Sequence, residues 1–361
     1  MKSPGIALLD MVSDEIKEKV TSQTDLLLRF RSNTVIGITG TKGKSTTSSL
    51  TCHILKECGK NAVLIGNIGI PPLERINEFE DDTIIVCEMS CHQLEYVKAS
   101  PDIAVLLNIF EEHLDHYVDF NAYRGAKENI YHYMDEKGML IIGSDCIHEQ
   151  FGCEVVTASL EHEADIFVTA DMLSINGVKI PLSGIDTKLI GHHNYYNIGI
   201  ALCIALTLGC DKDEALKAVS SFRGLPHRLE NVGIYNGVQY INDSISTCPS
   251  TAIAAVRSFD KVDTIIIGGM DRGIDYTELV DFLNNSDIEN VILLPDSGYR
   301  IYSELDGGKR SIYKAENLID AVRHAKNVTK VRCLLSPAAA SYGFYKNFEE
   351  RGEHFRKLVT E

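Results

Sequence analysis

The chain has 361 residues, 44% of them hydrophobic and 24% charged, a composition typical of a soluble protein with two or three domains. Its formal net charge of −16 repels the phosphates of nucleic acids, so we expect no nucleic-acid partner. The first ten residues do not resemble a signal peptide, and no apolar stretch is long enough to cross a bilayer. We therefore expect a cytoplasmic protein without a membrane partner.

Ten cysteines are spread singly along the chain, and no Cys-x-x-Cys pair occurs among them. In a chain of this length without a secretion signal, such cysteines are predicted to be buried free thiols rather than disulfides. The spacing also argues against a structural zinc site.

Short apolar runs alternate with helical patterns in the first half of the chain. This alternation predicts βαβ units and therefore a parallel sheet. Gly59 ends the first helical pattern. The predicted strands are residues 34–39, 83–87 and 103–107, and the predicted helices are residues 44–58 and 120–134.

A glycine-rich loop stands between the first predicted strand and the first predicted helix. Its glycines let the backbone approach phosphate oxygens, and the start of the helix adds N–H groups and a positive dipole end. Lys44 supplies a positive charge, and the hydroxyl of Ser45 or Thr46 is able to reach Mg²⁺. Ile38 stands where the strict pattern has glycine, so the loop is a variant. The predicted nucleotide-binding residues are Gly40, Thr41, Lys42, Gly43, Lys44, Ser45 and Thr46.

Polar residues follow the next two predicted strands. Glu88 follows residues 83–87, and Asn108 and His113 follow residues 103–107. Ligands bind at the carboxyl ends of parallel strands, which is also the edge that carries the phosphate loop. Because a carboxylate and an imidazole beside a triphosphate suit Mg²⁺, we expect Glu88 and His113 to lie beside the loop.

Lys127 lies on the apolar face of the helix predicted at residues 120–134, four residues from both Tyr123 and Tyr131. Two interpretations remain open. The stem of the side chain could pack while its ammonium group reaches solvent, or the residue could be a functional lysine that is held near the active site.

A second series of strands is predicted at residues 263–268, 290–294 and 331–335. It follows residues 223–226, where Gly and Pro end the helix predicted at residues 212–222. The predicted fold class is α/β, with a central P-loop ATPase domain on a mainly parallel sheet, followed by a Rossmann-like C-terminal domain. The predicted domains are residues 31–224 and 225–361, because the first thirty residues are too few to form one.

Taken together, these motifs resemble those of the Mur ligase family of bacterial cell-wall synthesis. The matching segments occur in the family's order and span nearly the whole chain. The last of them are most similar to the glutamate-adding type. The segments are residues 37–45, 66–69, 88–94, 108–115, 123–127, 193–197, 225–228, 242–244, 335–338 and 346–352.

The resemblance implies roles in binding ATP and metal. Lys44 and Asn67 would contact the β- and γ-phosphates. Lys127, as a carbamate, would carry a negative charge and orient a second Mg²⁺. The implied metal ligands are Thr46, Glu88, His113 and Lys127, and the implied catalytic residues are Lys44, Asn67, Glu88, His113 and Lys127.

Further implied roles concern the adenine and the amino acid. Asn194 and Asn197 would hold the adenine side, and Arg228 and Asp243 would close on the nucleotide from the second domain. The residues implied to bind the incoming amino acid are Thr247, Arg272, Ser341 and Phe348.

The implied activity is that of an ADP-forming ligase in peptidoglycan synthesis. It would join UDP-N-acetylmuramoyl-L-alanine to glutamate through an acyl phosphate, with ATP and Mg²⁺ as cofactors. We expect a monomer whose partners are these small molecules. Two alternatives stay open: a folylpolyglutamate-type or other amino-acid ligase with a substrate that lacks UDP, and a nucleotide-binding protein without catalysis. A P-loop kinase is disfavoured, because the second Rossmann-like half has no role in one.

Two positions depart from the family pattern. Ile245 and Arg272 both stand where lysine is usual. The loss of a cation at residue 245 would change which acidic amino acid, or which stereoisomer, is accepted. Arginine at residue 272 still suits a carboxylate, which it can clamp with two hydrogen bonds.

The start of the chain also departs from the family. Residues 2–6 resemble the very end of the family's uridine-nucleotide-binding domain, so residues 1–30 are expected to be a remnant of that domain with its linker. A truncated or divergent short form is the preferred explanation. The alternatives are a second chain that supplies the domain and a substrate without UDP. We therefore expect weak or absent affinity for UDP-sugars.

Overall fold

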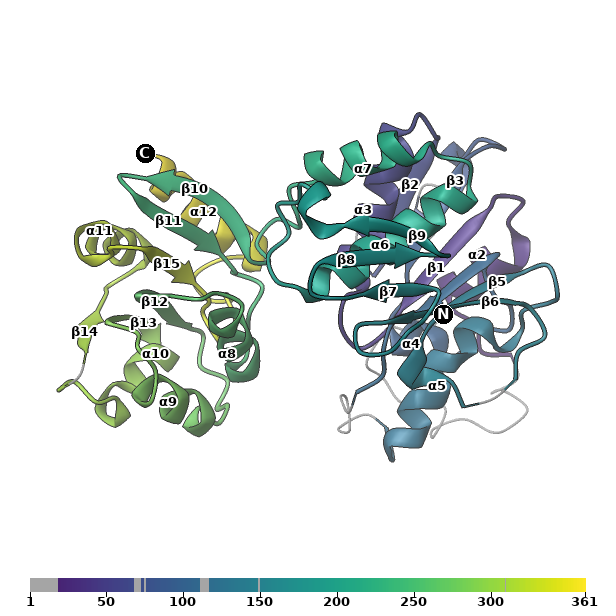
Figure 1. The fold of residues 1–361 in the computed structure, drawn as a ribbon. Helices are drawn as coiled ribbons and strands as arrows, with labels where there is room; N and C mark the ends of the chain where they lie inside the picture. Colours follow the sequence, from purple (N-terminus) through teal and green to yellow (C-terminus); the bar gives the residue numbers. More distant parts are fainter. Residues whose placement is uncertain (1–18, 68–72, 75, 111–116, 149, 309) are drawn as a thin grey trace. The chain divides into compact units, whose positions relative to one another are not determined.

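The computed structural model describes residues 19–67, 73–74, 76–110, 117–148, 150–308 and 310–361 (Figure 1). These residues fold into two compact units. The first unit runs to Thr187 and includes His192–Phe222, and the second comprises Lys188–Gly191 and Arg223–Glu361.

The first unit is built on a nine-stranded sheet with the order β2-β3-β1-β4-β5-β6-β7-β8-β9 (Figure 1). Neighbouring strands from β2 to β7 pair in parallel, whereas β7, β8 and β9 pair antiparallel. The apolar runs of β1, β3 and β4 are almost entirely buried, as expected for parallel strands covered on both faces. The strands are β1 (Val35–Thr39), β2 (Ala62–Gly66), β3 (Ile84–Glu88), β4 (Ile103–Leu106), β5 (Met139–Gly143), β6 (Glu154–Ser159), β7 (Ile166–Val168), β8 (Met172–Ile175) and β9 (Val178–Pro181).

Helices cover both faces of this sheet. Helices α3, α6 and α7 pack together on one face, and α2, α4 and α5 pack on the other. Asp119 and Asp211 cap α5 and α7, because their carboxylates accept backbone N–H groups of the first turn. The helices are α2 (Gln23–Phe30), α3 (Lys44–Glu57), α4 (Cys91–Leu94), α5 (Phe120–His132), α6 (His193–Thr207) and α7 (Lys212–Ser221), with short 3₁₀ turns η2 (Ile76–Glu78), η3 (Ser144–Cys146) and η4 (Leu182–Gly184).

The second unit contains a six-stranded sheet with the order β10-β11-β15-β12-β13-β14. The β10–β11 pair is antiparallel and the other pairs are parallel. Helices α8 and α9 bury one face, and α11 and α12 bury the other. The elements are β10 (Glu230–Tyr235), β11 (Val238–Asn242), α8 (Pro249–Arg257), β12 (Thr264–Gly269), α9 (Thr277–Asn284), β13 (Asn290–Asp296), α10 (Ser297–Arg300), η5 (Tyr302–Glu304), β14 (Ser311–Lys314), α11 (Leu318–Val328), β15 (Arg332–Leu335) and α12 (Phe348–Thr360).

The α/β fold class predicted from the sequence is confirmed, and every predicted strand and helix occurs with ends shifted by at most two residues. The β8–β9 and β10–β11 hairpins are not among the predicted elements. Each has a two-residue Asn-Gly turn with positive φ: Asn176 and Gly177 at 49° and 81°, and Asn236 and Gly237 at 52° and 80°. Such turns match the twist of antiparallel strands, so the Asn-Gly pairs were the signal that the analysis missed.

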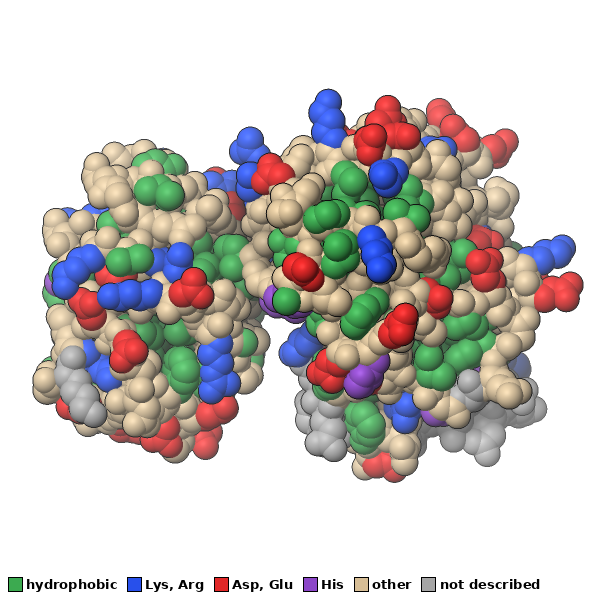
Figure 2. Space-filling view, in the orientation of Figure 1, with side chains coloured by type: hydrophobic (Ala, Val, Ile, Leu, Met, Phe, Trp, Pro, Cys, Tyr) green, Lys and Arg blue, Asp and Glu red, His purple; other side chains and the backbone are tan. Residues whose placement is uncertain are grey.

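The surface and the cysteines agree with the composition. All ten cysteines carry free thiols, as predicted, and most of them are buried. On the face drawn in Figure 2, basic side chains are interspersed with acidic ones. No helix in the described part of the chain combines the length and apolar character needed to cross a membrane.

Candidate functional site

The phosphate loop joins β1 to α3, and its two glycines adopt backbone angles that other residues rarely adopt. Gly40 has a φ of 152° and Gly43 a φ of 88°. A Cβ at Gly40 would lie 2.8 Å from Cβ of Leu107, and one at Gly43 would lie 2.8 Å from Oδ1 of Asn197. Conformation and space therefore both require glycine. Because α3 begins at Lys44, the N–H groups of its first turn directly follow the loop.

Two lysines converge on one carbonyl of this loop. The Nζ atoms of Lys44 and Lys127 each donate to the carbonyl of Gly40 at 2.8 Å, and Lys44 also donates to the carbonyl of Thr41 at 3.0 Å. Lys127 is only 1% exposed, and its Nζ lies 4.9 Å from the centre of the Tyr123 ring. The ammonium group of Lys127 does not reach solvent, so the first of the two interpretations is wrong, and a functional role for this lysine stays a prediction.

The segment after β4 fixes the shape of the loop. Asn108 forms three hydrogen bonds to it: its Oδ1 accepts from the Lys42 amide at 2.8 Å, its carbonyl accepts from the Thr41 amide at 2.9 Å, and its Nδ2 donates to the Lys42 carbonyl at 3.1 Å. The Thr41 hydroxyl accepts from the Phe110 amide at 2.9 Å and lies 2.9 Å from the hydroxyl of Tyr123. Residues beyond the phosphate-loop motif therefore fix the conformation of the loop.

Glu88 ends β3, which is paired with β1 so that Glu88 lies opposite Ile38. Its side chain is buried, and Oε1 accepts a hydrogen bond from Nδ2 of Asn67 at 2.9 Å. Oε2 is also buried, and it has no hydrogen-bond partner among the described residues. A buried carboxylate oxygen without a donor is costly unless a cation completes its environment.

The residues around Glu88 fit a hard metal ion such as Mg²⁺, which prefers oxygen ligands and keeps several waters. Thr46 lies in the first turn of α3 and is partly exposed. His113, the third predicted ligand, lies outside the described residues. Within those residues, no group of three or more His, Cys, Asp and Glu side chains forms a metal site by itself. Glu88 alone therefore gives a geometric reason for a metal.

The two asparagines predicted for the adenine side lie on α6, behind the loop. Nδ2 of Asn197 donates to Oδ1 of Asn194 at 2.9 Å, and Oδ1 of Asn197 accepts from the hydroxyl of Thr47 at 3.1 Å. These hydrogen bonds thus connect one turn of α6 to the first turns of α3. Burial lowers the pKa of the neighbouring His193, with a further contribution from His192.

In the second unit, Asp243 follows β11 and is buried. Its Oδ2 accepts hydrogen bonds from the hydroxyls of Ser246 at 2.5 Å and Ser336 at 2.8 Å, and its Oδ1 accepts from the Leu229 amide at 3.1 Å. Burial raises the pKa of Asp243 to about 6, although these hydrogen bonds and the charge of Arg228 oppose the rise. The carboxylate thus joins the segment before β10 to the loops that follow β11 and β15.

The raised pKa of Asp243 predicts a pH-dependent stability. Between pH 3.8 and about 6 the folded protein keeps a proton that the unfolded chain releases, so this group makes stability fall as pH rises through that window. Across this window Asp243 should lower the free energy of unfolding by up to about 3 kcal/mol, because one pKa unit corresponds to 1.36 kcal/mol. Asp243→Asn should abolish this pH-dependent loss of stability. Urea unfolding at several pH values measures it. Asp281→Asn, an exposed position on α9, is the control, and equal slopes in all three proteins would contradict the prediction.

The predicted amino-acid-binding residues and Arg228 all belong to the second unit. Nη2 of the exposed Arg272 donates to the carbonyl of Thr247 at 3.3 Å, so these two residues lie together. Ser341 is buried in the segment after β15, and Phe348 begins α12. The guanidinium of Arg228 is exposed. The predicted site residues therefore fall into two groups, with the phosphate loop and Glu88 in the first unit and the residues predicted to bind the amino acid in the second.

Several residues of these clusters were not predicted. Asn108 and Tyr123 shape the phosphate loop, whereas Ser336 and Asn242 belong to the polar network around Asp243 and His227. Arg351 is the largest fully buried side chain among the described residues. A signal for Arg351 was present, because it shares a helical face with Phe355 and Val359, four and eight residues later.

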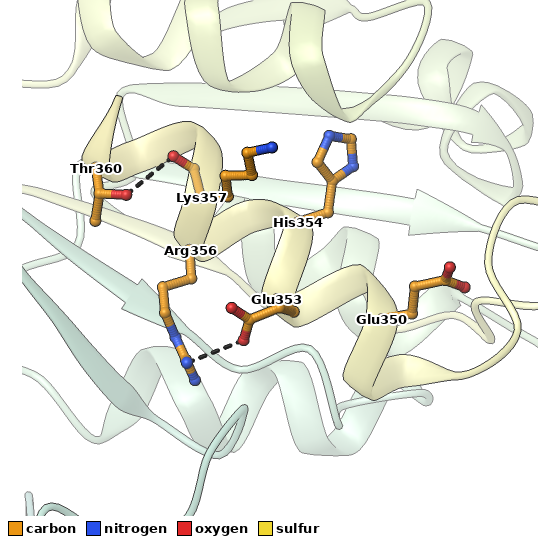
Figure 3. Close-up of a pocket in the computed structure, with 6 residues that line it drawn as sticks. All are labelled: Glu350, Glu353, His354, Arg356, Lys357 and Thr360. Atoms are coloured by element: carbon orange, nitrogen blue, oxygen red, sulfur yellow. Dashed lines mark hydrogen bonds and ion pairs between the residues drawn. The ribbon is translucent and has the colours of Figure 1, made fainter.

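A shallow pocket of about 460 Å³ lies elsewhere, along the exposed face of α12 (Figure 3). All of its lining side chains come from this one helix, and two of them, Arg356 and Glu353, form an ion pair at 2.9 Å. None of the predicted site residues lines it. The lining residues are Glu350, Glu353, His354, Arg356, Lys357 and Thr360.

Comparison with known sequences gives a match to a family model and relatives that align with nearly the whole of this chain. The family model described as the Mur ligase middle domain matches residues 38–205. The UDP-N-acetylmuramoylalanine–D-glutamate ligase of Geobacter sp. (strain M21) is 35% identical, over 99% of this chain and 82% of the relative. The ligase of the same name from Clostridium kluyveri is 32% identical, over 100% of this chain and 82% of the relative.

Solved structures share the fold at low identity. The MurF ligase of Thermotoga maritima, in complex with ADP, has a TM-score of 0.65 and 19% identity, and covers 96% of this chain and 84% of that one. The folylpolyglutamate synthase of Mycobacterium tuberculosis has a TM-score of 0.66 and 15% identity, with 98% of both chains covered. At these identities the likeness concerns the fold alone.

Proposed function

The chain belongs to the Mur ligase family of ATP-dependent ligases, and from this premise we propose that it joins glutamate to UDP-N-acetylmuramoyl-L-alanine through an amide bond. Support for this substrate pair comes from relatives whose names state it and which align with nearly the whole chain. The observation that carries the proposed chemistry is the phosphate loop beside a buried carboxylate at the ends of β1 and β3.

The proposed reaction begins with phosphate transfer. An oxygen of the substrate carboxylate attacks the γ-phosphorus of ATP, and the bond from this phosphorus to the bridging oxygen breaks. The products are ADP and the acyl phosphate of the substrate. The glutamate amine then attacks the acyl carbon, loses a proton and displaces phosphate. Lys44, Asn67 and the N–H groups at the start of α3 neutralise charge on the transferring group. Asn194 and Asn197 bind the adenine side.

Mg²⁺, when bound, would neutralise charge on the phosphates during transfer. We assign Thr46, Glu88 and His113 to hold it, with support from the unpartnered oxygen of Glu88. A carbamate on Lys127 would hold a second ion. Its formation requires the ammonium group of Lys127 to lose one proton; the resulting amine then joins carbon dioxide and releases a second proton. The carbamate nitrogen keeps one N–H, so the bond from Lys127 to the Gly40 carbonyl is able to persist.

The second unit supplies the other proposed contacts. Arg228 and Asp243 act on the nucleotide. Four residues of this unit bind the amino acid, and one of them, Arg272, is an exposed cation. Arg272 suits an acidic substrate because a guanidinium binds a carboxylate through two hydrogen bonds. The set is Thr247, Arg272, Ser341 and Phe348.

The test is a measurement of ADP release by the purified chain with Mg-ATP. We expect release only when UDP-N-acetylmuramoyl-L-alanine and glutamate are both present, with the amide product identified by mass spectrometry. D- and L-glutamate are assayed separately, because Ile245 replaces the usual lysine. Release that depends on a folate acceptor instead, or on no acceptor, would overturn the proposed substrates.

A further inference from the structure

Arg351 of α12 is an arginine buried without a counter-ion among the residues that the structure describes. It is 2% exposed, and each of its three nitrogens donates a hydrogen bond to a neutral oxygen. Nε donates to the hydroxyl of Ser244 at 3.0 Å, Nη2 to the carbonyl of Ser244 at 2.8 Å, and Nη1 to the carbonyl of Ala339 at 3.0 Å. No carboxylate of the described residues forms an ion pair with it.

The burial of this charge destabilises the folded protein. Burial lowers the pKa of Arg351 to about 10, a value at which the guanidinium still carries its charge at neutral pH. Neutral carbonyls satisfy its N–H groups but do not balance that charge, and an unbalanced buried charge is strongly unfavourable. An anion that binds nearby in another state of the protein would supply the missing charge.

The guanidinium lies beneath the carboxyl ends of three adjacent strands. Ser244 follows β11, Ala339 follows β15, and a Cβ at Gly269, the last residue of β12, would lie 3.1 Å from Nη1. Ligands of open parallel sheets bind outside this edge. The positive charge therefore lies next to the edge of the sheet where a small ligand of the second unit is expected.

The same contacts fix the two segments assigned to the amino acid. The hydroxyl of Ser244 accepts from Arg351 and donates to the carbonyl of Phe348 at 2.8 Å. The carbonyl of Ala339 lies two residues before Ser341. Arg351 thus links both segments to α12 through the Ser244 hydroxyl and two backbone carbonyls, and none of these groups carries a negative charge.

We propose that Arg351 is a positioning and specificity-determining residue for the incoming amino acid, whose carboxylates balance its buried charge. This inference rests on the proposed function. It explains how the chain is able to favour an acidic amino acid although Ile245 replaces the usual lysine at this edge.

The test compares R351Q, which removes the charge, with R351K, which keeps it. The matched control is R310Q. Arg310, the residue before β14, is also buried in this unit and donates to a backbone carbonyl, that of Leu283 on α9. The KM values for glutamate, glutamine and ATP, together with kcat, are measured for each protein. Glutamine keeps the shape of glutamate without its side-chain charge.

In R351Q we expect the KM for glutamate to rise at least about tenfold and the preference for glutamate over glutamine to shrink, since charge-assisted bonds are the strong ones. The KM for ATP should stay within about threefold, and R351K should recover the preference even where its kcat is low. R310Q should behave like the wild type. An unchanged glutamate preference in R351Q, or one lost equally in R351K, overturns the proposal.

The failure of the proposed function would be visible separately, as a wild type that releases no ADP with glutamate. Thermal unfolding of the full chain with glutamate, aspartate and glutamine then still tests Arg351. The acidic amino acids should stabilise the wild type and R351K more than glutamine does. If R351Q does not fold, the comparison of wild type with R351K decides. No stabilisation of the wild type by either acidic amino acid overturns the proposal.

Discussion

Replacing Lys44 with alanine should lower kcat by about a hundred- to a thousand-fold, the loss typical when one preorganised group that stabilises transferring charge is removed. The Nζ of Lys44 donates hydrogen bonds to the Gly40 and Thr41 carbonyls of the loop, within the region where the phosphates are proposed to bind. The free energy of unfolding should change by less than about 1 kcal/mol, because the side chain is partly exposed. ADP release and urea unfolding measure the two effects.

The matched control is Lys56→Ala, an exposed lysine in the last turn of the same helix, α3. It removes the same charge and the same number of atoms at the end of the helix away from the phosphate loop. Its kcat and its KM for ATP should equal those of the wild type. Similar losses in both variants would show that net charge, rather than the position of Lys44, determines the rate.

Replacing Glu88 with glutamine should also lower kcat by about a hundred-fold or more, because an amide does not supply the negative charge that a divalent ion needs. Glutamine is nearly the same size, and its Oε1 is still able to accept from Nδ2 of Asn67. The melting temperature should stay equal or rise, since the substitution removes a buried charge whose second oxygen has no partner among the described residues.

Magnesium titration of ADP release measures this effect. The variant should need a higher Mg²⁺ concentration for half-maximal activity, whereas Glu57→Gln, an exposed change at the end of α3, should not. Wild-type turnover by Glu88→Gln at the same Mg²⁺ concentration would rule out Glu88 as a metal ligand. A large fall in its melting temperature would instead assign the carboxylate a structural role.

Much of the fold was readable from the sequence because it depends on neighbouring residues. The apolar runs of β1, β3 and β4 predict buried strands, and the glycines before Lys44 predict a loop that opens a helix. Glu88 followed from the same reasoning, since the end of a strand is a local feature. The Asn-Gly turns are equally local, so the sequence also carries a signal for the two antiparallel hairpins.

The family resemblance was also contained in the sequence, because its motifs are short segments in a fixed order. It predicted an ATP-dependent ligase, and the relatives bear this out. The roles of single residues remain predictions, and His113 lies outside the described residues.

Only the tertiary structure decided which distant residues meet. Asn108 holds Lys42 across 66 positions of the chain, Lys127 reaches Gly40 across 87, and Arg351 reaches Ser244 across 107. Such contacts depend on the order of strands in the sheets and on the path of every loop between them. Periodicity shows that a side chain is buried, but its partners are set by the packing of elements far apart in the sequence. The charge of Arg351 could therefore be read from the sequence, whereas its lack of a counter-ion in the described part of the chain could not.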